Sequence, residues 1–418
     1  MDDLWVVLPH IGAGGAQKVG LLAAEHFAAQ GFKVRVLSLR HGHPIKHAIP
    51  DGVELLDLGP DVEVGGNRSL IEWGCRFTTA QLIKLCRFLT LAGLQLTWRW
   101  CEHKVQPDAD AWVTRLLAWC MEGLGGLRYR RLRALLQQQR PKRVLALLTK
   151  TNILCSAAVW DLPIHLVVSE RNDPRLQSID RLWSRLRCVY YRRADVVTAN
   201  TEGVLEALQA MGPWQRLALL PNPLPTALTL QDSHEPPVDR EAEVLAVARL
   251  VPQKGLDVLI RAFASLPESV RDGWSLTLVG DGPELATLQA LASDAGLRDL
   301  VHFEGFRSDP LVFMRRASIF ALPSRFEGMP NALLEAMAAG LPSVVTDASP
   351  GPLEMVCNGH QGLVVPTDDV SAFAAALQQL MLDGDLRNRC GVAARTTLRA
   401  LDWDVVESHW RSVLALPA

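Results

Sequence analysis

The chain is predicted to be an α/β protein of two lobes, each built on a doubly wound parallel sheet. Short β-rich apolar runs alternate with helical patterns through both halves of its 418 residues. A proline-rich polar stretch between residues 221 and 237 interrupts this alternation near the middle. The length also suggests more than one domain, on a prior of ~150 residues each. Ligands bind beyond the carboxyl ends of such strands, so we expect the lobes to face a cleft.

The first lobe is expected to span residues 1–222 and the second 223–400, followed by a helix in 401–418. That last helix carries Trp403, Val406 and Trp410 at helical spacing. This helix either packs on the second lobe or crosses back to the first lobe, and the sequence leaves both alternatives open. The strands expected in the first lobe are Leu4–Leu8, Val34–Leu39, Val144–Leu148, Ile164–Val168 and Val196–Thr198. Those expected in the second lobe are Leu245–Ala248, Leu276–Val279, Val301–Glu304, Ile319–Leu322, Ser343–Thr346 and Leu363–Val365.

Residues 62–143 contain no good strand and are predicted to form a helical insertion in the first lobe. Between Arg68 and Arg143 there are 14 Lys and Arg against 5 Asp and Glu. Tryptophan interleaved with arginine is typical of helices that lie on anionic membranes, and it equally suits helices packed onto a sheet, so both interpretations stay open. Nucleic acid is disfavoured because no binding motif accompanies the charge. The tryptophans concerned are Trp73, Trp98, Trp100, Trp112 and Trp119.

Cysteine content favours a cytoplasmic protein, and the charge of the first half is compatible with an anionic partner or with a merely solvated surface. Residues 1–222 hold 28 Lys and Arg against 20 Asp and Glu, whereas residues 223–418 hold 15 against 25. The eight cysteines are scattered without zinc-type spacing, as expected of free thiols in a reducing compartment. The N-terminus lacks the pattern of a secretory signal, and no clean membrane span is found. We expect a cytoplasmic protein that can associate peripherally with the cytoplasmic face of the inner membrane.

A glycine-rich loop that includes Gly14 and Gly15 follows the first expected strand and leads into a helix. A dinucleotide-binding loop would have a third glycine where Gln17 stands, and an acid near the end of the second strand, which ends at Arg40. NAD is therefore disfavoured. A tight strand-to-helix turn explains the loop, and its use as an approach point for a phosphate or an acceptor is an added hypothesis.

Two cations, Arg249 and Lys254, follow the first strand of the second lobe. Such a pair can neutralise the charge that accumulates on a departing diphosphate when a glycosyl–phosphate bond breaks. Surface salt bridging is the alternative. The acids further along the chain favour the first interpretation, in which Arg249 and Lys254 clamp a diphosphate.

Two acids, Glu327 and Glu335, flank the start of a helix that is expected to begin near Pro330 and to stop at Gly340. Ionised carboxylates only accept hydrogen bonds, so sugar and ribose hydroxyls suit them and phosphates do not.

The helix start itself is suited to an anion. The amides of Gly328, Met329 and Asn331 are expected to point out of it, where the helix dipole favours a pyrophosphate. Two isolated glutamates would ordinarily be surface residues, and it is the combination with the amides and cations that predicts a nucleotide-sugar site.

Taken together, these motifs resemble those of glycosyltransferase family 4, retaining enzymes with two Rossmann-like lobes in the GT-B architecture. The resemblance covers nearly the whole chain except the helical insertion. The motifs that carry it are Gly14-Gly15-Ala16-Gln17, Pro221-Asn222-Pro223, Arg249 with Lys254-Gly255, Gly280-Asp281-Gly282-Pro283-Glu284, and Glu327-Gly328-Met329-Pro330-Asn331 with Glu335.

The resemblance implies transfer of a hexose or N-acetylhexosamine from a nucleotide sugar, without a required metal or other cofactor. Arg249 and Lys254 would hold the diphosphate, Glu327 the hydroxyls of the transferred sugar, and Glu335 the ribose. The amides of Gly328 and Met329 would line the sugar, with Gly15 near the donor phosphate and the acceptor. The departing phosphate oxygen would accept the acceptor's proton.

One stretch departs from the family pattern, because many members carry a histidine where this chain has Ser169-Glu170-Arg171-Asn172-Asp173. This variant is similar to that of bacterial enzymes that build polysaccharides or lipid-linked oligosaccharides, including lipopolysaccharide, from UDP-sugars. Glu170 and Asn172 are candidates for the sugar pocket, and a plain strand end followed by a turn explains the segment almost equally well.

Asp108 and Asp110 have the spacing by which other sugar transferases bind a divalent metal. They fall inside the helical insertion without an adjacent strand, so we interpret them as a solvated helix start and predict no metal site. The prediction is a hexosyltransferase that acts on a glycan or lipid-linked acceptor. An epimerase of the same fold and a non-catalytic nucleotide-sugar-binding protein are the alternatives.

Overall fold

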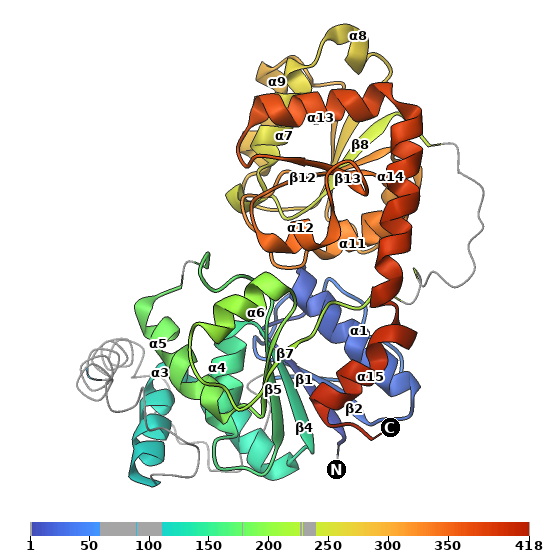
Figure 1. Ribbon diagram of the computed structural model, residues 1–418. Helices are drawn as coiled ribbons and strands as arrows, with labels where there is room; N and C mark the ends of the chain where they lie inside the picture. Colours follow the sequence, from blue (N-terminus) through green and yellow to red (C-terminus); the bar gives the residue numbers. More distant parts are fainter. Residues whose placement is uncertain are drawn as a thin grey trace. The chain divides into compact units, whose positions relative to one another are not determined.

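The computed structural model describes residues 2–58, 89, 111–177, 179–225, 228 and 240–417, with the backbone alone for 111–120 and 122–125. By its contacts the chain divides into two compact units (Figure 1). Unit 1 comprises Met1–Ala199, Leu205–Leu220 and His409–Ala418, and unit 2 comprises Asn200–Val204 and Pro221–Ser408. Each unit is a parallel sheet with helices, so the predicted fold class, the two-lobe α/β architecture called GT-B, is confirmed.

Unit 1 holds a seven-stranded sheet in the order β3-β2-β1-β4-β5-β6-β7, and all of its strand pairs are parallel. Its strands are β1 (Leu4–Leu8), β2 (Val34–Ser38), β3 (Glu54–Asp57), β4 (Arg143–Leu147), β5 (His165–Glu170), β6 (Val196–Ala199) and β7 (Leu217–Leu219). Its helices are α1 (Gly15–Ala29), α3 (Ala111–Gln139), α4 (Thr149–Ala158), α5 (Arg181–Tyr190), η1 (Tyr191–Arg193) and α6 (Glu202–Gln209), the last of which begins in residues counted with unit 2.

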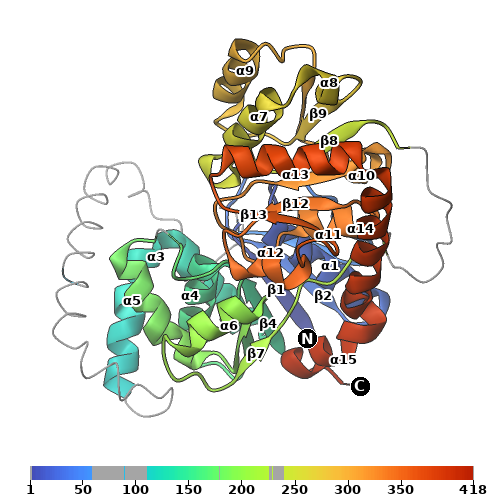
Figure 2. The ribbon, with the colours of Figure 1, turned by 45° about the horizontal axis from the view of Figure 1, so that its top comes forward.

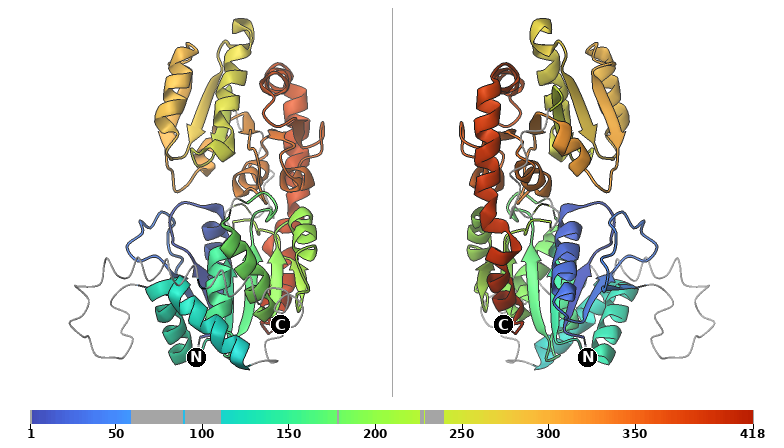
Figure 3. Two further views of the ribbon diagram at one scale, coloured as in Figure 1. Left: turned by 90° about the vertical axis from the view of Figure 1, so that its left-hand side faces the viewer. Right: turned by 90° about the vertical axis from the view of Figure 1, so that its right-hand side faces the viewer.

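Unit 2 holds a six-stranded parallel sheet in the order β10-β9-β8-β11-β12-β13. Figure 3 shows strands of this sheet in yellow to orange. The strands are β8 (Glu243–Val247), β9 (Ser275–Val279), β10 (Val301–Gly305), β11 (Ile319–Leu322), β12 (Ser343–Thr346) and β13 (Gly362–Val365). The helices are η3 (Pro252–Lys254), α7 (Leu256–Ser265), α8 (Glu268–Arg271), α9 (Leu285–Asp294), α10 (Leu311–Arg316), α11 (Asn331–Ala338), α12 (Pro350–Met355), α13 (Val370–Leu382), α14 (Gly384–Thr397), η4 (Leu398–Leu401) and α15 (Trp403–Leu414).

Alternation along the strands of unit 2 explains why helices cover both faces of its sheet. Val244 and Ala246 of β8 belong to one apolar cluster, with side chains of α7, α9 and α13. Leu245 between them belongs to another, with side chains of α10, α11 and α14. Successive side chains of a strand point to opposite faces, so near-continuous apolar runs are required. Figure 2 shows α7 and α13 packed together on the first of these faces.

The C-terminal helix α15 is divided between the units, because residues from His409 onward are counted with unit 1. Within unit 1, the Arg143 guanidinium donates to the carbonyl of Ala415 at 2.8 and 2.5 Å. The His165 ring lies 3.0 Å from the carbonyl of Val413. These bonds attach the end of the chain to β4 and β5.

Several expectations fall beyond the described residues. Most of the predicted insertion, with Trp73, Trp98 and Trp100, lies outside them, and so do Asp108 and Asp110. The backbone of 111–139 is helical as α3, with a non-helical residue at Gly126. Among the parts of the chain that are described, no helix is long and apolar enough to cross a membrane.

Candidate functional site

Lys254 and Glu327 meet in unit 2, although 72 residues lie between them in the sequence. Lys254 ends the short turn η3 beyond β8, and Glu327 follows β11, so both stand beyond the carboxyl ends of neighbouring strands. The Lys254 Nζ lies 2.5 Å from Glu327 Oε1. Ser324 Oγ donates to the same oxygen at 2.7 Å. One of the two predicted cations and one of the two predicted acids therefore occupy a single place.

The two oxygens of Glu327 differ in what they contact. The side chain is only 6% exposed, and Oε1 takes both bonds from Lys254 and Ser324. Oε2 accepts no hydrogen bond from any residue that the structure describes, and it is not among the fully buried atoms that lack a partner. A carboxylate oxygen accepts from hydroxyls. Oε2 is therefore a preset acceptor with a fixed orientation.

The segment that carries Glu327 is held against the segment that follows β12. The Glu327 N–H donates to Ser349 Oγ at 2.9 Å, and Thr346 Oγ1 donates to the carbonyl of Ser324 at 2.5 Å. Gly351 approaches so closely that a Cβ on it would lie 1.6 Å from the carbonyl oxygen of Gly328. Only glycine fits there, because the clash would be with backbone rather than with a flexible side chain.

The backbone just before α11 leaves amides without protein acceptors, and the first residue of this helix differs from the expected one. Pro330 is the N-cap, with extended backbone, and Asn331 is the first helical residue. Proline was expected one position further in; its carbonyl instead accepts the N–H groups of Leu333 and Leu334. Gly328 is buried, Met329 is half-buried, and in the described ranges neither amide N–H has a protein acceptor. Two donors thus remain for an anion or a sugar.

Asn222, near the start of the main part of unit 2, is hydrogen-bonded to the segment 328–331. Its Nδ2 donates to the carbonyl of Met329 at 3.1 Å and to Asn331 Oδ1 at 2.5 Å. Its own N–H lies 3.2 Å from the Met329 sulfur. Asn222 is 3% exposed. The sequence marked it only as part of a motif, since no local pattern shows a partner more than 100 residues away.

Arg249 and Glu335, the other members of the predicted set, are placed differently. Arg249 is exposed beyond β8 and makes no ion pair with any described residue. Glu335 is 3% exposed in α11, between Leu334 and Ala336 of the apolar cluster. The structure therefore brings Lys254 and Glu327 together. It leaves Arg249 exposed and able to bind an anion, and it buries Glu335 in α11.

The loop after β9 supports the backbone around Arg249. Gly280, at φ 150°, approaches the carbonyl of Ala248, and a Cβ there would lie 1.8 Å from that oxygen. The Leu250 N–H donates to the carbonyl of Asp281 at 3.0 Å, and the Glu284 N–H donates to that of Leu250 at 3.1 Å. The Gly280-Asp281-Gly282 motif therefore packs against the backbone on both sides of Arg249 and holds it in place.

In unit 1 the glycine loop is fixed by the segment that follows β2. Gly14 is the N-cap of α1, and Gly15, its first residue, is exposed. The rings of His10 and His43 stack with centroids 3.9 Å apart. The Lys46 N–H donates to the carbonyl of Ile11 at 3.0 Å. The glycine loop is therefore held in place by contacts with the segment that follows β2.

Glu170, the sugar-pocket candidate, ends β5 and has no exposed surface. Its Oε1 accepts from the Tyr191 hydroxyl at 2.5 Å, and its Oε2 accepts from Thr149 Oγ1 at 2.9 Å. Arg187 NH1 lies 3.7 Å away. Burial raises the pKa of this carboxyl, and Arg187 opposes the shift. Both oxygens have protein partners, which favours a role in holding the fold, whereas Asn172 beside it is half-buried with no described partner.

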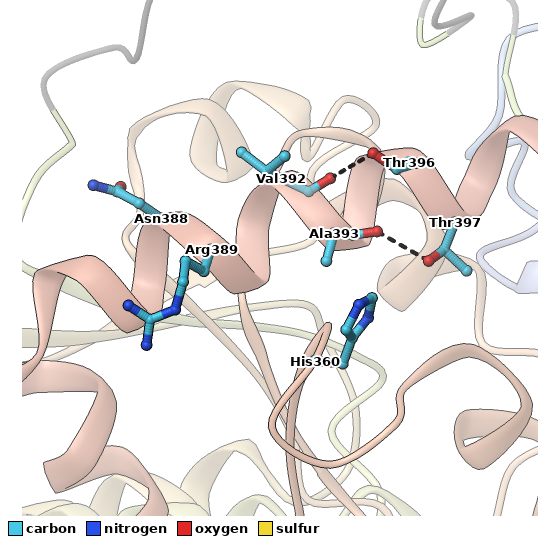
Figure 4. Close-up of a pocket in the computed structure, with 7 residues that line it drawn as sticks. All are labelled: His360, Asn388, Arg389, Val392, Ala393, Thr396 and Thr397. Atoms are coloured by element: carbon cyan, nitrogen blue, oxygen red, sulfur yellow. Dashed lines mark hydrogen bonds between the residues drawn. The ribbon is translucent and has the colours of Figure 1, made fainter.

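A separate hollow lies on one face of α14, as Figure 4 shows. It has a volume of about 590 Å³ and contains one cation and no carboxylate. It lacks the cation and acid pair that a sugar diphosphate needs, and none of the predicted donor residues lines it. Its lining residues are His360, Asn388, Arg389, Val392, Ala393, Thr396 and Thr397. Across the ranges that the structure describes, no three His, Cys, Asp or Glu side chains group as metal ligands.

The fold belongs to the class of two-lobe GT-B proteins, and the comparisons with known proteins agree. Residues 230–397, inside unit 2, match the family model described as "Glycosyl transferases group 1". The chain is 33% identical over 215 residues to the lipopolysaccharide core biosynthesis glycosyltransferase LpsE of Rhizobium meliloti (strain 1021), covering 51% of this chain and 61% of that protein.

A second relative from Campylobacter jejuni covers more of the chain. It is N-acetylgalactosamine-N,N'-diacetylbacillosaminyl-diphospho-undecaprenol 4-alpha-N-acetylgalactosaminyltransferase, 29% identical over 60% of this chain and 69% of that protein. The crystal structure of Anabaena Alr3699/HepE in complex with UDP-glucose is similar with a TM-score of 0.68 at 18% identity, over 99% of this chain and 100% of that one. The chain spans about half the length of several other curated relatives, 45% in one case.

Proposed function

We propose that this protein is a retaining glycosyltransferase that moves a hexose or N-acetylhexosamine from a nucleotide sugar to a glycan or lipid-linked saccharide. The observation that carries the proposal is the Lys254–Glu327–Ser324 cluster with one free carboxylate oxygen, beside two unpaired amides. Cations suit the diphosphate, and the acid suits the sugar hydroxyls, so one small site matches both halves of the donor. Similarity to a group 1 glycosyl transferase model over 230–397 supports it.

In the proposed reaction, Lys254 serves two partners at once. An ammonium has three N–H donors, and the bond to Glu327 Oε1 uses one of them. The other two are available to the diphosphate, for which the exposed Arg249 is the second proposed cation. Fixed cations stabilise the departing diphosphate more than the bound substrate, which lowers the barrier.

The bonds change at one carbon of the sugar. The bond from the anomeric carbon to the phosphate oxygen breaks, and a bond from the acceptor oxygen to the same carbon forms on the same face. The acceptor's proton passes to the departing phosphate oxygen, so the products are the glycoside and a nucleoside diphosphate. No protein nucleophile and no resident metal or other cofactor enter this scheme.

The donor is proposed to be UDP-linked, because the similar Anabaena structure holds UDP-glucose. A lipid-linked or lipopolysaccharide acceptor is proposed from the names of the Rhizobium and Campylobacter relatives. Peripheral contact of the basic segment 62–143 with anionic lipid on the cytoplasmic face remains part of the proposal. Co-sedimentation with anionic and neutral liposomes tests that contact, and equal recovery in both pellets would contradict it.

A panel of UDP-, GDP- and ADP-sugars, each assayed by thermal shift and by product analysis, tests the function. A ligand that binds only the folded state raises the melting temperature. We expect a UDP-sugar to do so, and an acceptor saccharide to gain one sugar. Conversion of the donor sugar without any acceptor would instead identify an epimerase. Donor binding without hydrolysis or transfer would identify a binding protein.

A further inference from the structure

Two residues outside the cluster tie the backbone segment of Lys254 to that of Glu327. The Arg325 N–H donates to the carbonyl of Gln253 at 2.8 Å. In return, Gln253 Nε2 donates to the carbonyl of Phe326 at 2.9 Å. The residue before the lysine and the two residues before the glutamate are thus bonded in both directions.

The Arg325 side chain extends this connection to three further groups. Its NH1 donates to the carbonyl of Pro252, the first residue of the η3 turn. NH1 and NH2 bond the two oxygens of Asp257 in α7 at 3.1 and 3.0 Å, and Nε bonds Asp368 at 2.8 Å. A planar guanidinium can hold this set, whereas an ammonium lacks the fork. The turn before Lys254 is therefore fixed at its first residue and at its second.

Close backbone contact reinforces the same junction. Gly255 has φ 60°, in the left-handed region, and a Cβ on it would lie 2.0 Å from the carbonyl oxygen of Pro323. The turn can lie against the end of β11 only because residue 255 has no side chain. Residues on both sides of Lys254 are therefore held against residues 323–326.

We propose that Arg325 and Gln253 are positioning residues, which hold the Lys254 ammonium at Glu327 so that both reach the same sugar diphosphate. The inference rests on the proposed function. A lysine side chain has four rotatable bonds, so a fixed backbone limits where Nζ can lie. A displacement of about 1 Å in a reacting group can cost about 100-fold in rate.

A contribution to general stability does not explain the arrangement. Neither residue belongs to the two apolar clusters of unit 2. The Arg325 side chain is 30% exposed, and its partners Asp257 and Asp368 are 39% and 53% exposed. Ion pairs with such exposure contribute little to folding. The bonds at Pro252, Gln253 and Phe326 instead join the segment of Lys254 to that of Glu327.

The test uses Arg325→Ala, Arg325→Lys and Gln253→Ala in the full chain. Arg307→Ala is the matched control, because this exposed arginine of unit 2 pairs with Glu304 at 2.7 Å. We expect Arg325→Ala to lower kcat/KM for the donor about 30-fold and Arg325→Lys nearly as much. The melting temperatures should stay close to that of the control. Wild-type kcat/KM in both Arg325 variants would overturn the inference.

A double-mutant cycle separates positioning from plain destabilisation. If Arg325 acts through Lys254, Arg325→Ala should cost less than about twofold in a Lys254→Ala background, because groups that act as a unit are not additive. The same loss of kcat/KM, about 30-fold, in both the wild-type and the Lys254→Ala backgrounds would contradict the inference. If the wild type neither binds nor transfers any nucleotide sugar, the proposed function fails and the inference with it; if the wild type transfers and the cycle is additive, only the inference fails.

Discussion

Two buried glutamates, one in each unit, stand at the carboxyl ends of parallel strands, and they are used differently. Glu170 ends β5 and is 0% exposed, and Glu327 follows β11 and is 6% exposed. Glu170 gives Oε1 to Tyr191 and Oε2 to Thr149. Glu327 gives only Oε1 to the protein and keeps Oε2 open. Location at a strand end is therefore not enough to define a ligand-binding acid, whereas an oxygen left without a protein partner is a direct sign of one.

Removal of the Glu327 carboxylate is expected to have the largest effect. Glu327→Ala should lower kcat/KM by about 100-fold or more, on the scale of other groups that stabilise a transition state. Glu304→Ala, a change at a half-buried acid of the same unit that lies outside the proposed site, is the control. Circular dichroism should show both variants folded. Unimpaired turnover by Glu327→Ala would contradict the proposal that Glu327, unlike Glu170, binds the donor.

Tyr191→Phe tests the structural half of the comparison. It removes the donor to Glu170 Oε1 inside unit 1, and a buried acceptor left short of a bond to a charged group costs about 1.5–3 kcal/mol of folding free energy. Urea unfolding should show this loss, while donor KM for the folded enzyme should not change. Tyr129→Phe, which removes a longer bond of 3.5 Å to an uncharged carbonyl, should lose less. A raised KM without lost stability would instead make Glu170 part of the sugar pocket.

Arg249→Ala is expected to weaken donor use about tenfold. Its guanidinium is exposed and makes no ion pair with a described residue, so the change removes a cation from the site without breaking a contact in the fold. The melting temperature should match that of the wild type. Arg298→Ala, at another exposed arginine of unit 2, should leave both quantities unchanged. Equal kinetics for the two variants would remove Arg249 from the clamp.

The exposed pair Arg133–Asp161 gives the smallest expected effect, as a baseline for carboxylates that are neither buried nor in the site. The hydrogen bond from Arg133 lowers the pKa of Asp161. A lowered pKa means that the stabilisation is present above the ordinary aspartate pKa and is lost as the pH falls through the lowered value. Asp161→Asn should therefore be slightly less stable than the wild type at pH 7, and the difference should vanish in acid. A difference that grows in acid would refute the assignment.

The strands in the middle of each sheet could be predicted from the sequence because they are buried on both faces. Their apolar runs fix their positions to within about two residues, the usual limit for element ends. The edge strands β3 and β7 were missed. Glu54–Asp57 is half-exposed and begins and ends with an acid, and Leu217–Leu219 has only three residues. A strand with exposed acids and a strand of only three residues both lack the long apolar run that marks the other strands.

In the site, the sequence could predict types of residue more readily than their partners. The proline, glycine and acid pattern placed a helix start close to Pro330, and the helix ends just before Gly340, which has φ 75°. The hydrogen bonds in which Ser324, Ser349 and Asn222 take part could not be foreseen in the same way. Two of these residues lie 22 and more than 100 positions from what they hold, and only the folded sheet brings such segments together.

The division of α15 between the units bears on how the protein is made. Residues His409–Ala418 belong to unit 1, whose other members all precede residue 221. Translation proceeds from the N-terminus and domains tend to fold as they emerge from the ribosome. The first residues of β4 and β5, Arg143 and His165, therefore lack their partners at Ala415 and Val413 until all of unit 2 has been synthesised. A chain that stops near residue 408 lacks both of these contacts with unit 1.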